Sequence, residues 1–245
     1  MPKKPYLYMV RVDVEASEQA RFARWSDQRH MPDLLEIGFW AAVRYQSLLT
    51  LPAYLHLYEI PNLEIFNTQA YKYICRCDPS CPTLACKNKA GDPPTPTGPQ
   101  ITRHIKGISR AVYQELFDVG MGQPRPRPPG RRDDPVGYVR SKTIVTVAAD
   151  FPPDVENEFV QWQQSVHMPR TVKAGLGITA GLLARRVDSL PFQAPKYLVL
   201  WEVKGPEVIQ SNPSLGKYLQ RPDIQRIWSR AQNRQDHLLQ RIFPA

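Results

Sequence analysis

The sequence predicts an α+β fold built from two copies of one β-α-β-β-α-β unit. The segment Trp25-Ser-Asp-Gln-Arg-His-Met-Pro32 recurs, with the same spacing, as Trp162-Gln-Gln-Ser-Val-His-Met-Pro169. The segment 52–60 likewise matches 195–203. Self-similarity at several matching places indicates a duplicated structural unit. The 245 residues then divide into a first unit at 1–122, a linker at 123–140 and a second unit at 141–245, each unit a normal size for a compact domain.

The elements of each unit follow from hydrophobic periodicity. Short alternating stretches rich in Val, Tyr and Leu predict strands, and an apolar stripe through Val155, Phe159, Trp162 and Val166 predicts an amphipathic helix. In the first copy we expect a strand at 6–13, a helix at 18–30, strands at 39–46 and 54–60, a second helix from about 62, and the segments 101–109 and 111–117. In the second copy we expect strands at 143–150, 184–188 and 197–203, a helix from about 206, a helical stretch at 222–234 and a strand at 237–243.

This element order predicts a four-stranded antiparallel sheet with two helices on one face. The opposite face would carry Tyr, Trp and Leu side chains and must be covered. Two copies can cover each other by packing sheet to sheet. The predicted architecture is therefore a barrel-like pseudo-dimer within one polypeptide.

Charge and composition narrow the classes of function. The chain carries a net charge of +9 and is 42% apolar. Nearly half of the excess positive charge lies within residues 123–142, so neither copy has the clustered basic face of a nucleic-acid-binding domain. No apolar run is long enough to span a membrane. The N-terminus leads into a strand without a secretory signal, so we expect a cytoplasmic protein. The Pro- and Arg-rich linker is expected to be extended and solvated.

An insert at 75–100 in the first copy contains the cysteines of the chain, at positions Cys75, Cys77, Cys81 and Cys86. Thiolates at this density could bind a structural zinc ion, although the spacing is not that of common zinc ribbons. Two disulfides would suit an exported protein, and a reduced Pro-rich loop is the third interpretation. The insert could also act as a lid.

The repeated motif contains the first candidate catalytic residues, His30 and His167. The proline two residues later is expected to end each helix, so that each histidine projects from a helix C-terminus. At about 100° per residue, each should point away from its tryptophan, Trp25 or Trp162. The tryptophans suit core packing. A helix-end histidine can simply complement the helix dipole, but its presence in both copies favours a functional role.

Further candidates lie on the predicted strands. His56 and Tyr58, with Trp201 in the second copy, alternate with leucines and should share one face. Arg44, which falls near the place of Arg185 in the second copy, could hold a phenolate, enolate or carboxylate. Tyr45 or Tyr58 could donate a hydrogen bond to developing oxyanion charge.

The strand, the W-x4-H-M-P motif, the Gly38-Phe39 turn and the Pro-x-Tyr-Leu strand together resemble the dimeric α+β barrel superfamily, and within it EthD-like proteins. The resemblance implies tandem ferredoxin-like units with a pocket between the sheet and helices of each unit. Carried onto this chain, the pocket residues are Trp25, His30, His56, Tyr58 and Tyr73 in the first copy, and Trp162, His167, Tyr197, Trp201 and Tyr218 in the second. Val199 stands at the position of His56, so the first copy is the richer in titratable groups.

The leading hypothesis is a cofactor-independent enzyme that uses histidine acid–base chemistry on a small aromatic or polyketide-like molecule. A lyase, isomerase or cyclase outcome is favoured over monooxygenation. Relatives in the superfamily also include haem proteins, so a haem held by one of the histidines is an alternative. A non-catalytic protein that binds a hydrophobic ligand is another. We expect no nucleic-acid or membrane partner, and a homodimer is compatible with the sequence.

Overall fold

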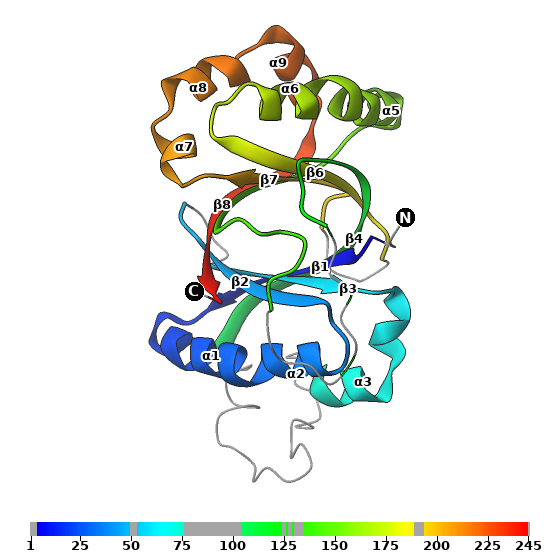
Figure 1. The fold of residues 1–245 in the computed structure, drawn as a ribbon, viewed down its shortest axis with the longest axis vertical. Coiled ribbons are helices and arrows are strands. Elements are labelled where there is room, and N and C mark those ends of the chain that lie inside the picture. Colours follow the sequence, from blue (N-terminus) through cyan, green and yellow to red (C-terminus); the bar gives the residue numbers. More distant parts are fainter. Residues whose placement is uncertain are drawn as a thin grey trace.

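A computed structural model describes residues 4–49, 53–75, 104–123, 126, 129, 135–188 and 194–244. Within them, eight strands form one closed antiparallel barrel in the ring order β1-β3-β2-β8-β5-β7-β6-β4 (Figure 1). The strands are β1 (Tyr6–Val14), β2 (Ala41–Ser47), β3 (Tyr54–Ile60), β4 (Ile105–Val119), β5 (Thr143–Asp150), β6 (Ile178–Arg186), β7 (Tyr197–Val203) and β8 (Gln232–Phe243).

The ring order shows how the two copies join. Each copy has the same internal strand order, β4-β1-β3-β2 in the first and β8-β5-β7-β6 in the second. The edges then meet reciprocally, because β2 pairs with β8 and β4 pairs with β6. The duplication and the barrel are therefore present, and hydrogen-bonded edges leave no open strand in the ring.

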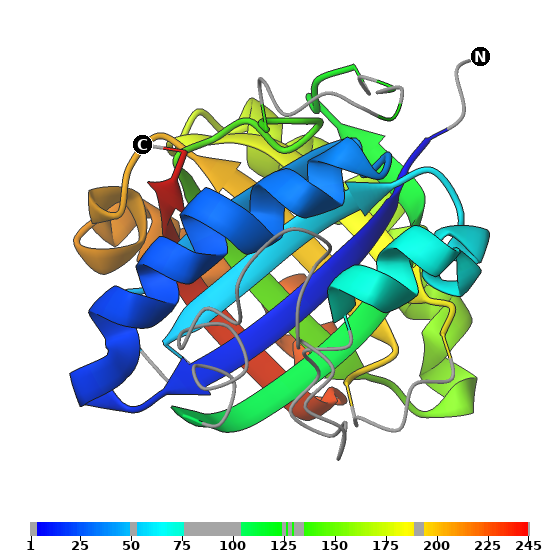
Figure 2. The same cartoon turned by 90° about the horizontal axis from the view of Figure 1, so that it is seen from below.

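Helices cover the outside of the barrel at two opposite ends of the molecule (Figures 1 and 2). Those of the first copy are η1 (Ala16–Glu18), α1 (Gln19–Trp25), η2 (Ser26–His30), α2 (Met31–Glu36), η3 (Leu63–Asn67) and α3 (Gln69–Cys75). Those of the second are α5 (Pro153–Trp162), η5 (Gln163–His167), α6 (Met168–Lys173), α7 (Glu207–Gln210), α8 (Pro213–Leu219) and α9 (Pro222–Trp228).

The prediction that the first helix of each copy ends at its histidine is wrong. Met31 and Met168 keep helical dihedral angles, and the helices continue into α2 and α6. Between the two parts lies a π-turn, η2 or η5, in which the methionine N–H bonds to the carbonyl five residues earlier, that of Ser26 or Gln163. A proline ring clashes with the carbonyl four residues before it in a regular helix. The wider turn relieves that clash, so the helix bends and continues.

β6 begins at Ile178, six residues before the strand expected at 184–188. Two further boundaries also differ from expectation. The helix predicted at 222–234 ends at Trp228, and β8 already begins at Gln232. In the first copy, 101–109 and 111–117 were expected as separate segments, but β4 runs through both as one strand, from Ile105 to Val119. In both places a polar, charged stretch pairs along a barrel strand, where backbone hydrogen bonding outweighs the weak local preference.

The barrel encloses an apolar core that the linker helps to fill. Tyr138 and Val139 are each 1% exposed and pack among inward-facing leucines of β1, β3 and β7. In Figure 1 the green segment that precedes β5 runs through the middle of the molecule, between the strands of the first copy and those of the second. The expectation of a solvated linker is therefore wrong for this segment. Most of residues 124–134 lie outside the described part of the chain, as do residues 76–103, which contain all of the 75–100 insert except Cys75.

Carboxylates at equivalent places in the two copies hold this segment. Glu59 accepts hydrogen bonds from the backbone N–H groups of Tyr138 and Val139. Glu202 accepts from those of Arg140 and Ser141. Both carboxylates point into an otherwise apolar barrel interior. There they accept hydrogen bonds from backbone N–H groups that would otherwise be buried without a partner.

Candidate active site

The repeated tryptophan and histidine form a stacked pair in each copy. The ring centroids of Trp25 and His30 are 4.7 Å apart at an interplanar angle of 17°. Those of Trp162 and His167 are 4.4 Å apart at 8°. The expectation that each histidine points away from its tryptophan is wrong, because that expectation assumed 100° per residue. In a π-turn, residues five apart lie nearly above one another.

In the first copy, the π-turn brings polar side chains onto the outer face of β2 and β3. Ser26 Oγ and His56 Nε2 are 3.0 Å apart, and both residues are buried. Asp27 accepts two hydrogen bonds from Arg44, from Nε at 2.9 Å and from Nη2 at 2.6 Å. The third nitrogen of this guanidinium, Nη1, is buried without a partner in the part of the chain that the structure describes. A bidentate carboxylate fixes the guanidinium plane and aims that free N–H group.

The environment of His56 keeps its imidazole neutral. Burial, together with the charges of Arg44 and His30, holds the pKa of His56 well below its usual value of 6.5. A hydrogen bond with the Val10 backbone acts in the opposite direction, as a ring N–H donating to a carbonyl would. With that nitrogen protonated, Nε2 is the acceptor and Ser26 donates to it. Two predicted residues, His56 and Arg44, therefore lie side by side on β3 and β2, and the motif histidine His30 is close enough for its charge to act on His56.

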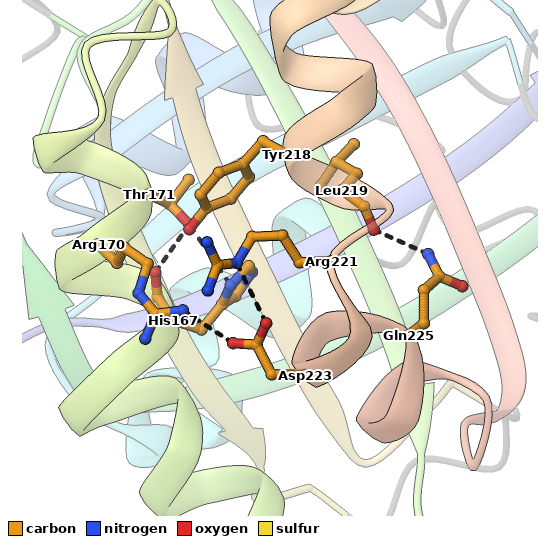
Figure 3. Close-up of polar contacts among 8 residues, drawn as sticks. All are labelled: His167, Arg170, Thr171, Tyr218, Leu219, Arg221, Asp223 and Gln225. Atoms are coloured by element: carbon orange, nitrogen blue, oxygen red, sulfur yellow. Dashed lines mark hydrogen bonds and ion pairs between the residues drawn. The ribbon is translucent and has the colours of Figure 1, made fainter.

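In the second copy, the equivalent histidine belongs to a different network (Figure 3). Thr171 Oγ1 donates to the His167 carbonyl at 2.7 Å and lies 2.9 Å from Tyr218 Oη. Asp223 pairs with Arg170 at 2.8 Å and with Arg221 at 3.1 Å. Burial lowers the pKa of His167 to about 4, and the charge of Asp223 only partly offsets it. His167 is thus a neutral, enclosed residue.

The strand registers show why the copies differ. Arg44 pairs with His56 between β2 and β3, and Leu183 pairs with Val199 between β6 and β7. The second copy therefore has apolar residues at both positions, and the expected match of Arg44 with Arg185 is two residues out of register. Gln163, the counterpart of Ser26, is fully buried, and neither polar atom of its amide has a partner among the described residues.

The remaining predicted residues lie in several places. Tyr58 stacks on His56 at 6.1 Å, on the face expected for it. Trp201 meets His167 edge to face at 5.7 Å, and Tyr218 stacks on the same ring at 6.3 Å. Tyr197 packs against Phe159 beneath α5.

Tyr45 does not belong to this site. It points into the barrel, is fully buried and donates to the Ser141 carbonyl. Burial raises its pKa far above the usual range. Successive residues on a strand point to opposite faces of the sheet. Tyr45 therefore faces the barrel interior while Arg44 faces the helices, and Tyr45 cannot act beside Arg44.

The cysteine cluster and Tyr73 lie beyond what the structure describes. Cys77, Cys81 and Cys86 fall outside the described residues, and Cys75 and Tyr73 are described only as backbone of α3. Among the residues with described side chains, no group of His, Cys, Asp and Glu is arranged to hold a metal ion. None of the described helices is both long enough and apolar enough to cross a membrane.

Ser26 and Asp27 are the site residues that sequence reasoning missed. Both lie inside the motif, directly after its tryptophan. A signal was present, because the second copy keeps the tryptophan and histidine but replaces this pair with Gln163 and Gln164. A difference between two copies of one motif marks positions where their roles diverge.

No protein-family model matches the chain, and no curated protein matches it. Solved structures do match over almost the whole chain. An anthrone oxidase-like protein superposes with a TM-score of 0.64 at 9% identity, covering 98% of this chain and 92% of that one. A protein from Lactobacillus acidophilus NCFM, provisionally named a monooxygenase, gives 0.53 at 9% identity, with 98% and 94% covered. Chlorite dismutase from Candidatus Nitrospira defluvii gives 0.54 at 8% identity, with 100% and 93% covered. The chain therefore has the dimeric α+β barrel fold.

Proposed function

We propose that the first copy is the active site of a cofactor-independent enzyme, and that the chain is a tandem of two ferredoxin-like units of the EthD-like type. The observation that carries the proposal is the buried, unpartnered Nη1 of Arg44 beside a neutral His56. A fixed cationic donor next to an uncharged imidazole suits a reaction that removes a proton and leaves negative charge on oxygen. The second copy has Leu183 and Val199 at these positions.

The proposed reaction is proton abstraction from carbon next to a carbonyl, or from a phenol, of a small aromatic substrate. His30 is partly exposed and stacked on Trp25, so it can reach a substrate while its ring plane is held. The C–H bond breaks, the proton passes to the imidazole, and the electron pair moves onto the carbonyl oxygen as an enolate. Arg44 Nη1 would donate to that oxygen. Return of the proton to another carbon gives isomerisation, and loss of a leaving group gives a lyase reaction.

Ser26 and His56 would position this machinery. A neutral His56 next to His30 adds no like charge when His30 becomes protonated. The Ser26 hydroxyl, 3.0 Å from His56 Nε2, fixes the ring of His56. Two of the structural neighbours are named as an oxidase-like protein and a monooxygenase, so attack of the carbanion on oxygen is the alternative outcome at the same site.

Solvent-deuterium exchange tests the proposal and does not require the product to be identified. The protein is incubated in D₂O with a panel of hydroxylated aromatic ketones, and loss of the exchangeable C–H signal is followed by NMR. We expect exchange with at least one compound, slowed by ~100-fold or more in His30→Phe and in Arg44→Met. His167→Phe is the matched control and should retain the wild-type rate. Equal exchange in all variants would contradict the assignment, and tight binding without exchange would indicate a ligand-binding protein.

A haem site is the second candidate, because structures of a chlorite dismutase are among the structural neighbours. An axial histidine must present a ring nitrogen to the iron. His56 Nε2 already contacts Ser26, and His167 is 5% exposed with Nδ1 near Thr171. Neither residue fits the role of axial ligand. A Soret band on haem titration that is lost in His30→Phe would support haem binding against our proposal.

A further inference from the structure

Arg11 is a buried cation inside the barrel, away from the proposed active site. It lies on β1 on the same face as Leu7 and Met9 of the inner core, and it is 6% exposed. Its Nη1 donates to Gln235 Oε1 on β8. In the ring, β3 and β2 separate β1 from β8, so this side chain crosses the lumen. Its Nη2 is buried and has no partner, and no carboxylate pairs with it among the described residues.

Further polar groups face the same part of the lumen. Thr146 lies on β5 two residues from both Ile144 and Ala148, so it faces the inner core with them. It is fully buried, and its hydroxyl has no partner in the described chain. Thr146 pairs across the strands with His237. His237 is 8% exposed, and burial together with the charge of Arg11 lowers its pKa to about 4. It is therefore a neutral imidazole close to the guanidinium.

The duplication provides the space that Arg11 occupies. Its counterpart in the second copy is Ala148, which lies directly opposite Gln235 in the β5–β8 ladder. The long side chain of Arg11 can thus extend towards a place where the second copy has only the methyl group of Ala148. An apolar residue would fill this position without any electrostatic penalty, whereas a buried charge is normally paired.

We infer that the barrel interior binds a small inorganic anion, such as chloride, between Arg11 Nη2 and the hydroxyl of Thr146. The anion would neutralise the guanidinium and accept hydrogen bonds from both unpaired donors at once. The nearby Tyr113 cannot serve as the counter-charge, because burial raises its pKa to about 12. Both donor atoms are buried, so bulk water does not compete with the anion for them.

Bromide, which scatters anomalously, tests the site directly. In crystals grown from sodium bromide we expect an anomalous peak in contact with Arg11 Nη2 and Thr146 Oγ1. In solution, thermal unfolding in sodium bromide is compared with that in sodium gluconate at equal ionic strength. The wild-type midpoint should rise saturably with bromide, because a ligand that binds only the folded state stabilises it.

Variants make the test specific. Arg11→Met should lose both the peak and the bromide-dependent rise, and Thr146→Val should weaken the apparent affinity at least ~10-fold. Arg24→Met, at an exposed position on α1, is the control and should respond like the wild type. A water molecule without anomalous signal at this place, or an equal bromide response in Arg11→Met, would overturn the inference.

Discussion

The two motif histidines show how the same residue acquires different chemistry from its neighbours. His30 is stacked on Trp25 and acts electrostatically on a second imidazole, that of His56, whereas His167 is enclosed by Trp162 and Tyr218. The repeat was sufficient to select both residues from the sequence. Their direction was not predictable from periodicity, because the π-turn changes the angle per residue and has no sequence signature beyond the proline that follows.

Burial of His167 predicts a pH-dependent loss of stability. Its pKa is about 4 in the folded chain and 6.5 in the unfolded chain. The folded pKa is the lower one, so the contribution is fully present above pH 6.5 and is lost as the pH falls towards 4. Between pH 7 and pH 5 this single residue should account for about 2 kcal/mol of lost unfolding free energy.

Urea unfolding of the wild type and His167→Phe at pH 7 and pH 5 measures this effect. The variant keeps a stacked ring, and its stability should fall by about 2 kcal/mol less over the same interval. His104→Gln is the control, since His104 lies just before β4 and its side chain is a third exposed. The same pH dependence in His167→Phe and wild type would show that His167 is not an enclosed neutral group.

At the scale of elements, the strands were the most predictable part of the chain. The third strand of each copy, Tyr54–Ile60 and Tyr197–Val203, was predicted with the bounds that the structure shows. The linker was the least predictable, because its Pro- and Arg-rich composition concealed a short apolar stretch at 136–139. Glu59 and Glu202 were visible as a repeated acidic residue within apolar strands, but their backbone partners lie about 60 to 80 residues away in sequence.

The close contact between the linker and Glu59 predicts an effect of substituting Gly137. A Cβ added there would overlap the Glu59 carboxylate, with Oε1 only 2.5 Å away, and this carboxylate cannot move without losing two buried backbone hydrogen bonds. Gly137→Ala should therefore lower the free energy of unfolding by about 1–3 kcal/mol.

Gly216→Ala is the matched control for this substitution. Gly216 lies in α8, and an added Cβ meets nothing within 4 Å. The helical preference of alanine should raise stability by about 0.5–1 kcal/mol. Denaturant unfolding of both variants gives the comparison, and a neutral Gly137→Ala would mean that the linker is not held against Glu59.

At the scale of the whole molecule, the pseudo-dimeric barrel was predicted from the repeat and from the need to cover an apolar sheet face. The sequence did not show how the two sheets would meet. Closure depends on long-range pairing of β2 with β8 and of β4 with β6, and on a core shared by both copies. These contacts join residues from opposite ends of the chain, which local patterns cannot report.

Closure of this kind predicts that the two copies stay together without a covalent connection. A specific protease site inserted between residues 129 and 130 allows the full-length, folded protein to be cut. We expect the two fragments to co-elute at the size of the intact protein, because two strand ladders and the buried core hold them. Size-exclusion chromatography in native buffer measures this, and separate elution of the fragments would show that the connection itself maintains the barrel.

A symmetric homodimer encodes every substitution twice, so a bulky positive residue near its axis would collide with its own image. Placing both halves on one gene removes that constraint. Arg11 at the position equivalent to Ala148, and His56 at the position equivalent to Val199, are combinations that a homodimer cannot encode. Each half can then change its polarity and its duties independently, while the shared barrel stays intact.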